Sequence, residues 1–160
     1  CGSNAMSTHK KPIFHKSIDD IKELISAISL PVIIKEIMTL EDALTAVEAG
    51  TSAIVVFNHG GRVLDHTPGT ADALPNISAE LKGKTMILAD GGIRTGYDLL
   101  KMLALGADAV LIGRDIIRAA VGGGIEGVKL QMEYLQKTLV KAMTMTNCSS
   151  LKEISSEIIH

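Results

Sequence analysis

The chain contains the stretch Val55-Val56-Phe57-Asn58-His59-Gly60-Gly61-Arg62, in which an apolar run passes abruptly into polar and glycine residues. The apolar part is rich in β-branched residues, which predicts a buried strand ending near Phe57. In parallel α/β folds the carboxyl ends of strands carry the functional groups, because the strand fixes where each side chain starts and glycine lets the backbone approach a ligand. We therefore expect a functional site at this junction.

The same alternation of helix and strand extends on both sides of this stretch. Apolar periodicity predicts an amphipathic helix over residues 17–29, and Ser17 with Asp20 resembles a capping box at its start. Short apolar runs predict four strands, at residues 30–35, 53–57, 85–89 and 109–112. Helices are expected between the strands, followed by a short helix, the glycine run Gly122 to Gly124 and a long helix over roughly residues 126–145. Strands that alternate with helices imply right-handed crossovers and a parallel sheet.

Four strands make half of a familiar architecture. We predict an α/β fold, a parallel (βα)4 half of a TIM-type (β/α)8 barrel, because a complete barrel takes about 250 residues and this chain has 160. Such a half leaves two sheet edges and an apolar inner face uncovered. We therefore expect two copies to associate as a homodimer or a higher homo-oligomer. The competing fold is an open doubly wound sheet, which would cover both faces with helices and could be monomeric.

The chain divides into four predicted segments. Residues 1–6 contain Ser-Asn-Ala-Met, which resembles the remnant of a removed tag. Residues 7–16 are expected to be a disordered or extended lead-in, and residues 17–148 the half-barrel domain. Residues 149–160 are expected to form a C-terminal tail or a short helix.

Composition excludes several classes of function. The net charge is −2 and the pI is near 6.2, and lysine and arginine are spread through the chain. The sequence therefore has no basic patch that would indicate a nucleic-acid partner. The apolar runs are far shorter than the roughly 20 residues that a membrane-spanning helix needs. Because Cys1 lies in the predicted tag remnant, Cys148 is the one native cysteine, which predicts no disulfide and a cytoplasmic location. No metal site is predicted.

Ionisable side chains follow all four predicted strands, and they are Lys35, His59, Arg62, Asp90, Arg94 and Arg114. A single such residue is most simply explained by a surface salt bridge, but repetition at one rim favours a shared site. The turns Gly91-Gly92-Ile93-Arg94 and Gly113-Arg114 each precede a predicted helix start. Their backbone N–H groups and arginines suit a phosphate, and the alternative is that these glycines serve only tight turns.

These motifs resemble a known family. The chain is similar to the carboxyl-terminal half of the FMN-dependent α-hydroxy acid oxidases and dehydrogenases, the glycolate oxidase and L-lactate oxidase group. The resemblance runs from about Ser17 to Cys148. It rests on the runs Leu30 to Lys35, Asn58 to Arg62 with Leu64-Asp65 and Thr67-Pro68, Asp90 to Arg94, and Leu105 to Val110 with Gly113-Arg114.

The resemblance implies FMN as cofactor and roles for the matching residues. His59 would take a proton from the substrate while two electrons pass to the flavin, a role that suits imidazole. Arg62 would pair with the substrate carboxylate, and Lys35 would stabilise the reduced flavin ring. Besides Lys35, five residues are expected to bind the cofactor. Asp90 and Arg94 would hold the ribityl chain and the phosphate. Gly92, Gly113 and Arg114 would hold the phosphate.

Two positions depart from the family pattern. Phe57 stands where the family has a small serine that contacts the flavin, and Glu36 stands where it has a glycine. Bulk at the first position and negative charge at the second both oppose flavin binding. The family's first four βα units are also absent from the chain, and with them the aspartate that orients the catalytic histidine.

Three hypotheses about function follow. The chain is part of an enzyme that oxidises a small (S)-2-hydroxy acid to the 2-oxo acid, with the missing groups supplied by another chain. Alternatively it is a catalytically impaired half-barrel that binds FMN, a phosphorylated ligand or an anion. The third is a truncated relative that folds through self-association and has no activity.

Overall fold

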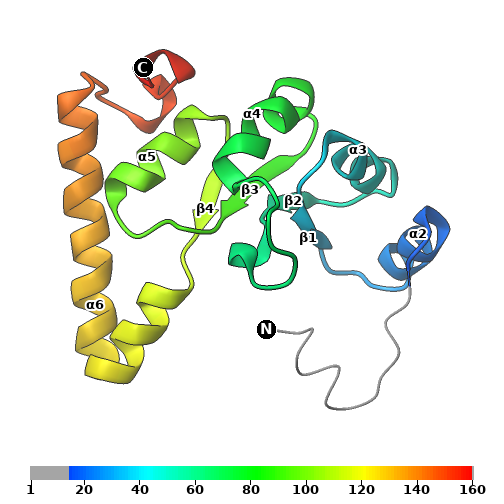
Figure 1. Ribbon diagram of the computed structural model, residues 1–160, viewed down its shortest axis with the longest axis horizontal. Coiled ribbons are helices and arrows are strands. Elements are labelled where there is room, and N and C mark those ends of the chain that lie inside the picture. Colours follow the sequence, from blue (N-terminus) through cyan, green and yellow to red (C-terminus); the bar gives the residue numbers. More distant parts are fainter. Residues whose placement is uncertain (1–14, 160) are drawn as a thin grey trace.

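The structure, a computed structural model, describes residues 15–159. The predicted tag remnant and residues 7–14 of the predicted lead-in lie outside the described residues. Helices and strands alternate along the described chain, and the four strands form the centre of the molecule (Figure 1). The elements are α2 (Ile18–Ser26), β1 (Ile33–Ile37), α3 (Leu40–Glu48), β2 (Ala53–Val56), η1 (His59–Gly61), α4 (Thr70–Leu81), β3 (Met86–Asp90), α5 (Gly96–Ala104), β4 (Ala109–Leu111), α6 (Arg114–Met145), η2 (Leu151–Glu153) and η3 (Ser156–Ile158).

The four strands form one sheet in the order β1-β2-β3-β4, and every neighbouring pair is parallel. A doubly wound sheet reverses its strand order at a switch point, whereas a barrel adds each strand beside the last. In the described residues each strand lies beside the one that precedes it in the sequence, as in a barrel. The predicted (βα)4 half of a TIM-type barrel is confirmed, and the doubly wound alternative is wrong.

Alternating side chains give the sheet two different faces. Ile54 and Val56 of β2 point to the helix side, where they belong to the main core with residues of α3 and α4 such as Ala46 and Leu74. Val55, between them, belongs to a second, smaller cluster with Ala53, Phe57 and Leu88 on the other face. This second face corresponds to the interior of a complete barrel, because helices of a barrel cover only the outside.

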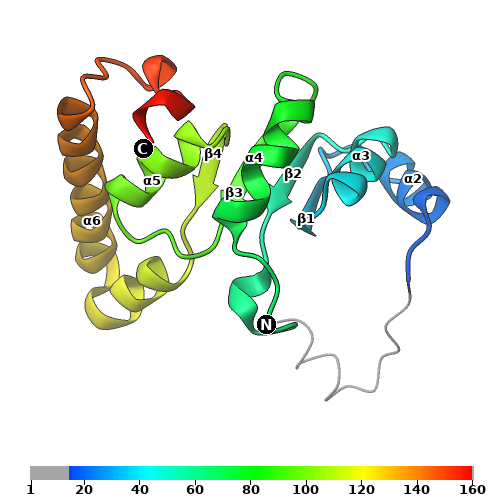
Figure 2. The same ribbon diagram turned by 45° about the horizontal axis from the view of Figure 1, so that its top comes forward.

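The two outer strands are more exposed than the two central ones. All four residues of β2 are buried, whereas Ile33 of β1 is 51% exposed and Leu111 of β4 is 36% exposed. The prediction of a buried strand at residues 30–35 was therefore wrong in burial, and the strand begins and ends later than predicted. β1 and β4 lie at opposite ends of the sheet, with α3 and α2 beyond one end and α5 and α6 beyond the other (Figure 2).

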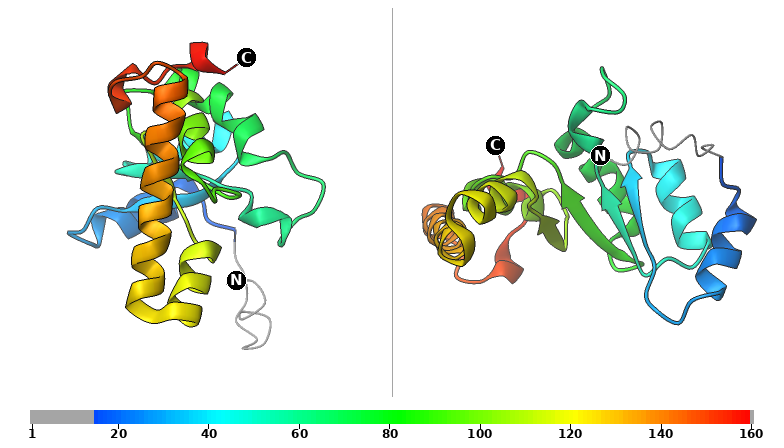
Figure 3. Two further views of the ribbon diagram at one scale, coloured as in Figure 1. Left: turned by 90° about the vertical axis from the view of Figure 1, so that its left-hand side faces the viewer. Right: turned by 90° about the horizontal axis from the view of Figure 1, so that it is seen from below.

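The C-terminal helix is bent at glycine, as the sequence indicates. α6 breaks at Gly124, whose φ of 56° and ψ of −140° are not helical. A Cβ at Gly127 would lie 2.3 Å from the Ala119 carbonyl oxygen, so the two segments of α6 pack closely against each other. Figure 3 shows the shorter segment beside the longer one. The predicted short helix, glycine run and long helix are confirmed, and the Cys148 thiol is buried and free.

Candidate functional site

All eight residues singled out from the sequence line one cavity of about 400 Å³ at the carboxyl ends of the strands. They come from all four βα units, and they are Lys35, His59, Arg62, Asp90, Gly92, Arg94, Gly113 and Arg114. Glu36, Phe57, Gly60 and Leu111 are among the other residues that line it. The parallel sheet thus brings together side chains that are far apart in the sequence.

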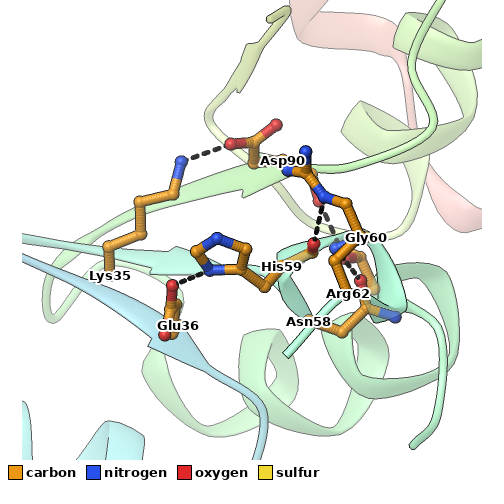
Figure 4. A network of polar contacts seen from close by, with 8 residues as sticks. Lys35, Glu36, Asn58, His59, Gly60, Arg62 and Asp90 are labelled. Atoms are coloured by element: carbon orange, nitrogen blue, oxygen red, sulfur yellow. Dashed lines mark hydrogen bonds and ion pairs between the residues drawn. The ribbon is translucent and has the colours of Figure 1, made fainter. Parts of the chain in front are cut away.

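The Lys35 side chain lines the cavity and has two neighbours there. Its ammonium group forms an ion pair with the Asp90 carboxylate (Figure 4) and lies 4.3 Å from the centroid of the Phe57 ring. Thr70 Oγ1 donates a 2.7 Å hydrogen bond to the Asp90 carbonyl oxygen and so holds the end of β3. Because an ammonium is attracted to an aromatic face as well as to a carboxylate, Lys35 is held on two sides.

The turn that presents His59 is held by the preceding residue. Asn58 Oδ1 accepts a 2.9 Å hydrogen bond from the Gly60 N–H, and Asn58 Nδ2 donates a 3.1 Å bond to the Pro68 carbonyl oxygen. His59 and Gly60 have φ values of 58° and 66°, in the left-handed region. The imidazole ring lies 5.4 Å from the Phe57 ring, measured between centroids. The turn therefore projects the imidazole back over the end of β2.

A β-bulge places a second group beside this imidazole. Lys35 pairs with Val55 and Ile37 pairs with Val56, so Glu36 is an extra residue on β1. As a result the side chains of Lys35 and Glu36 both line the cavity, although adjacent strand residues normally face opposite sides. The Glu36 carboxylate contacts His59 Nδ1 (Figure 4). The sequence identified Glu36 only as a departure from the family pattern and missed this contact.

Three arginines bring further positive charge to the cavity, and they are Arg62, Arg94 and Arg114. Within residues 15–159, no carboxylate lies at ion-pair distance from any of them. A Cβ on Gly60 would lie 3.7 Å from Arg62 Nε and 3.9 Å from Arg114 Nη2, so these two guanidinium groups flank the same glycine. Like charges so close favour a bound anion between or beside them.

Asp98 supports the loop that carries Arg94. Its Oδ2 accepts hydrogen bonds from the backbone N–H groups of Arg94 (3.1 Å) and Thr95 (3.0 Å) and from the Thr95 hydroxyl (2.9 Å). Partial burial opposes ionisation of this carboxyl, but these hydrogen bonds outweigh it and lower the pKa of Asp98 below its ordinary value of 3.8. The sequence indicated the helix cap at Thr95 but not the hydrogen bond from the Arg94 N–H to the Asp98 carboxylate.

Other kinds of site have no support in the part of the chain that the structure describes. Residues 15–159 contain no group of three or more His, Cys, Asp and Glu side chains placed to hold a metal ion. No helix among them has the length and apolar character needed to cross a membrane.

Comparison with known proteins gives consistent matches. The profile of the FMN-dependent dehydrogenase family matches residues 3–160. An L-lactate oxidase from Nostoc sp. is 47% identical over 142 residues, which are 89% of this chain and 39% of that protein. 2-Hydroxyacid oxidase 2 from Bos taurus is 44% identical over 141 residues, which are 88% of this chain and 40% of that protein.

Solved structures agree in fold. A mandelate oxidase variant with the monooxide FMN adduct is 40% identical and superposes with a TM-score of 0.81, covering 86% of this chain and 44% of that one. The chain thus spans about two fifths of the length of the curated relatives that it matches.

The low pKa of Asp98 predicts a pH dependence of stability. The unfolded chain binds a proton at Asp98 more readily, so the stabilisation is complete above pH 3.8 and is lost as the pH falls through the lower pKa of the folded state. We expect Asp98→Asn to lower the free energy of unfolding by about 1 kcal/mol at pH 7. The difference from the parent chain should shrink below pH 3.8.

Urea unfolding at a series of pH values measures this effect. Asp19→Asn is the matched control, because Asp19 is exposed and its carboxylate accepts no hydrogen bond from the described residues. A difference between Asp98→Asn and the parent that is the same at every pH would contradict the prediction.

Proposed function

The chain belongs to the FMN-dependent dehydrogenase family, and on that premise we propose that it takes part in the oxidation of a small (S)-2-hydroxy acid to the 2-oxo acid. FMN is the cofactor of the family. One observation carries the proposal: a single cavity is lined by an imidazole, a lysine and three arginines from all four strand ends. This set combines a base with the cationic groups that a carboxylate substrate and a phosphate-bearing cofactor both require.

The residues at one end of the cavity fit the phosphate of FMN. Arg94 and Arg114 have no carboxylate at ion-pair distance among the described residues, and Gly113 stands at the N-terminus of α6. Gly92 has a φ of 75°, and a Cβ there would meet no atom within 4 Å, so the loop leaves room for a group beside its backbone. We assign Asp90, Gly92, Arg94, Gly113 and Arg114 to the cofactor, together with Lys35.

The side chains around the turn after β2 fit the substrate. His59 would accept the proton of the substrate hydroxyl, and the planar guanidinium of Arg62 would pair with the carboxylate. Arg62 Nε donates a 3.2 Å hydrogen bond to the His59 carbonyl oxygen, which ties the two groups to one turn. Bound FMN would take up the two electrons released by the substrate, and the charge of Lys35 would favour their arrival.

The described residues form only four of the eight strands of a closed barrel. The described residues end in two exposed sheet edges, and a barrel needs four more parallel strands to close. We propose that a second copy covers the exposed edges and the apolar inner face, because it carries the same four parallel strands. In this arrangement residues 17–148 are the functional unit and residues 149–160 an accessory tail. The cytoplasmic location stays a prediction from Cys148.

Light scattering tests the association directly. We expect twice the chain mass, or a higher multiple, at micromolar concentration. The exposed side chain of Ile33 on the β1 edge gives a probe, since Ile33→Lys would place a charge in the covered surface and shift the mass towards the monomer. Val121→Lys on α6, where the side chain is 85% exposed, is the control. A parent chain of monomer mass would refute the proposal.

The arginine at the start of α6 gives a test of cofactor binding. If Arg114 holds the phosphate, Arg114→Ala should raise the Kd for FMN by about 10-fold to 100-fold, because a charge-assisted hydrogen bond is lost. Lys141→Ala removes the same charge from an exposed position of the same helix and should leave the Kd unchanged. Fluorescence titration of FMN measures both, and anaerobic addition of L-lactate to the complex should bleach the flavin. Equal Kd values for Arg114→Ala and the parent would contradict the assignment.

A second candidate function rests on Phe57. Its ring lies within the cavity, 8% exposed, and contacts both the Lys35 ammonium and the imidazole. A ring at this position takes up space beside Lys35, where the resemblance places the flavin. The second candidate is a half-barrel that binds FMN, a phosphorylated ligand or an anion through its arginines without oxidising a substrate.

Replacing the ring tests whether Phe57 obstructs the flavin. Phe57→Ser should tighten FMN binding by about tenfold, which corresponds to about 1.4 kcal/mol, because it makes room for the flavin ring. Phe57→Leu keeps most of the bulk and is the matched control. Binding of inorganic phosphate, measured by calorimetry, should be the same in both variants. If Phe57→Ser leaves FMN affinity unchanged in a protein that remains folded by circular dichroism, Phe57 does not obstruct the cofactor.

A further inference from the structure

We propose that Glu36 is a positioning residue for His59, which holds the imidazole with its proton on Nδ1 so that Nε2 carries the lone pair. The inference rests on the proposed function of His59 as a base and names the group that would set its tautomer. The Glu36 carboxylate contacts His59 Nδ1 and lines the same cavity. An ionised carboxylate only accepts hydrogen bonds, so it selects the tautomer that has a proton on the nitrogen facing it.

The bulge in β1 explains how Glu36 reaches the imidazole. In a regular strand Glu36 would face the helices, because Lys35 faces the cavity. The register shift between Lys35 and Ile37 leaves Glu36 without a partner on β2, and the carboxylate turns to the same side as the lysine. β-bulges commonly re-aim one side chain next to a functional site. Here the bulge supplies a carboxylate to a turn of the neighbouring strand.

Both partners of the contact have an unfavourable backbone conformation. Glu36 has a φ of 74° and His59 a φ of 58°, in the left-handed region that favours glycine. A glycine at position 36 would adopt this φ without strain, so the backbone gives no reason for a glutamate. Strain of this kind gathers at functional sites, where the surrounding structure maintains it. The strained backbone at position 36 is therefore explained by the Glu36 side chain, which contacts His59.

The pair also balances the proton transfer. When Nε2 takes the hydroxyl proton of the substrate, the ring becomes an imidazolium with a proton on each nitrogen. The negative charge of Glu36 then faces the Nδ1–H and offsets the new positive charge. The net charge of the Glu36–His59 pair passes from −1 to 0. The carboxylate therefore stabilises the imidazolium that forms when His59 accepts the proton.

Nitrogen NMR of the full chain reads the tautomer without cofactor or substrate. The ¹⁵N chemical shifts of the His59 ring are measured at a pH where titration of the same signals shows the ring to be neutral. We expect the Nδ1–H tautomer to predominate in the parent. In Glu36→Ala and Glu36→Gly its ratio to the Nε2–H tautomer should fall by about threefold to tenfold, because one charge-assisted hydrogen bond to a half-exposed carboxylate is lost.

Three further variants separate positioning from a structural role. Glu36→Asp keeps the carboxylate and should keep part of the tautomer preference, whereas Glu80→Ala removes an equal charge from an exposed site on α4 and should change nothing. Glu36→Gly relieves the strained φ, so it should lose the tautomer preference while the urea midpoint of unfolding rises or stays the same. A purely structural ion pair would instead lower the midpoint and leave the tautomer ratio unchanged.

The outcomes distinguish this inference from the proposed function. An Nε2–H tautomer in the parent, or the same ratio in Glu36→Ala, overturns the role of Glu36 whether or not the chain binds FMN. A parent that holds the Nδ1–H tautomer but neither binds FMN nor oxidises L-lactate supports the role of Glu36 and overturns the enzymatic proposal.

Discussion

Parallel pairing of the four strands is the constraint on which the rest of the structure depends. Parallel strands require a crossover after each strand, and these crossovers place α3, α4 and α5 on one face. The same rule brings every strand to its end at one rim, so Lys35 and Arg114 meet in one cavity although most of the domain lies between them in sequence. It also leaves the opposite face, around Val55 and Leu88, with only a small apolar cluster. Site, core and uncovered surface are three results of one pairing pattern.

The charges of the cavity fall into two groups with different roles. Lys35 and Asp90 neutralise each other, and the Glu36 carboxylate contacts the His59 ring, so these four residues form two pairs. The three arginines that line the same cavity have no carboxylate at ion-pair distance among the described residues. An anion that enters the cavity is therefore attracted to the arginines, while the imidazole ring contacts the Glu36 carboxylate. The arginines that would bind an anion and the imidazole that would accept a proton therefore lie in one cavity, and each has its own charged neighbours.

Much of this arrangement could be predicted from the sequence, and what could not has physical reasons. β-Branched runs followed by glycine predict strand ends well. Because the ends of parallel strands meet at one rim, the eight site residues could be expected to lie together. The same runs do not distinguish an edge strand from a central one, so the burial of Ile33 was predicted wrongly. The bulge at Glu36 could not be foreseen either, because its φ is imposed by tertiary contacts and opposes the local preference of glutamate. The contact with His59 depends on that φ and was invisible for the same reason.

The bulge in β1 has a consequence for solubility as well. An exposed strand edge offers unpaired N–H and C=O groups to any other chain, and a long, regular edge invites aggregation. In β1 the regular pairing with β2 is interrupted at Glu36, and a bulge of this kind bends the strand and twists its other edge. A straight strand from another chain would therefore pair poorly along this edge. The bulge that turns Glu36 towards the imidazole thus also makes the open edge of the sheet less regular and a poorer template for pairing.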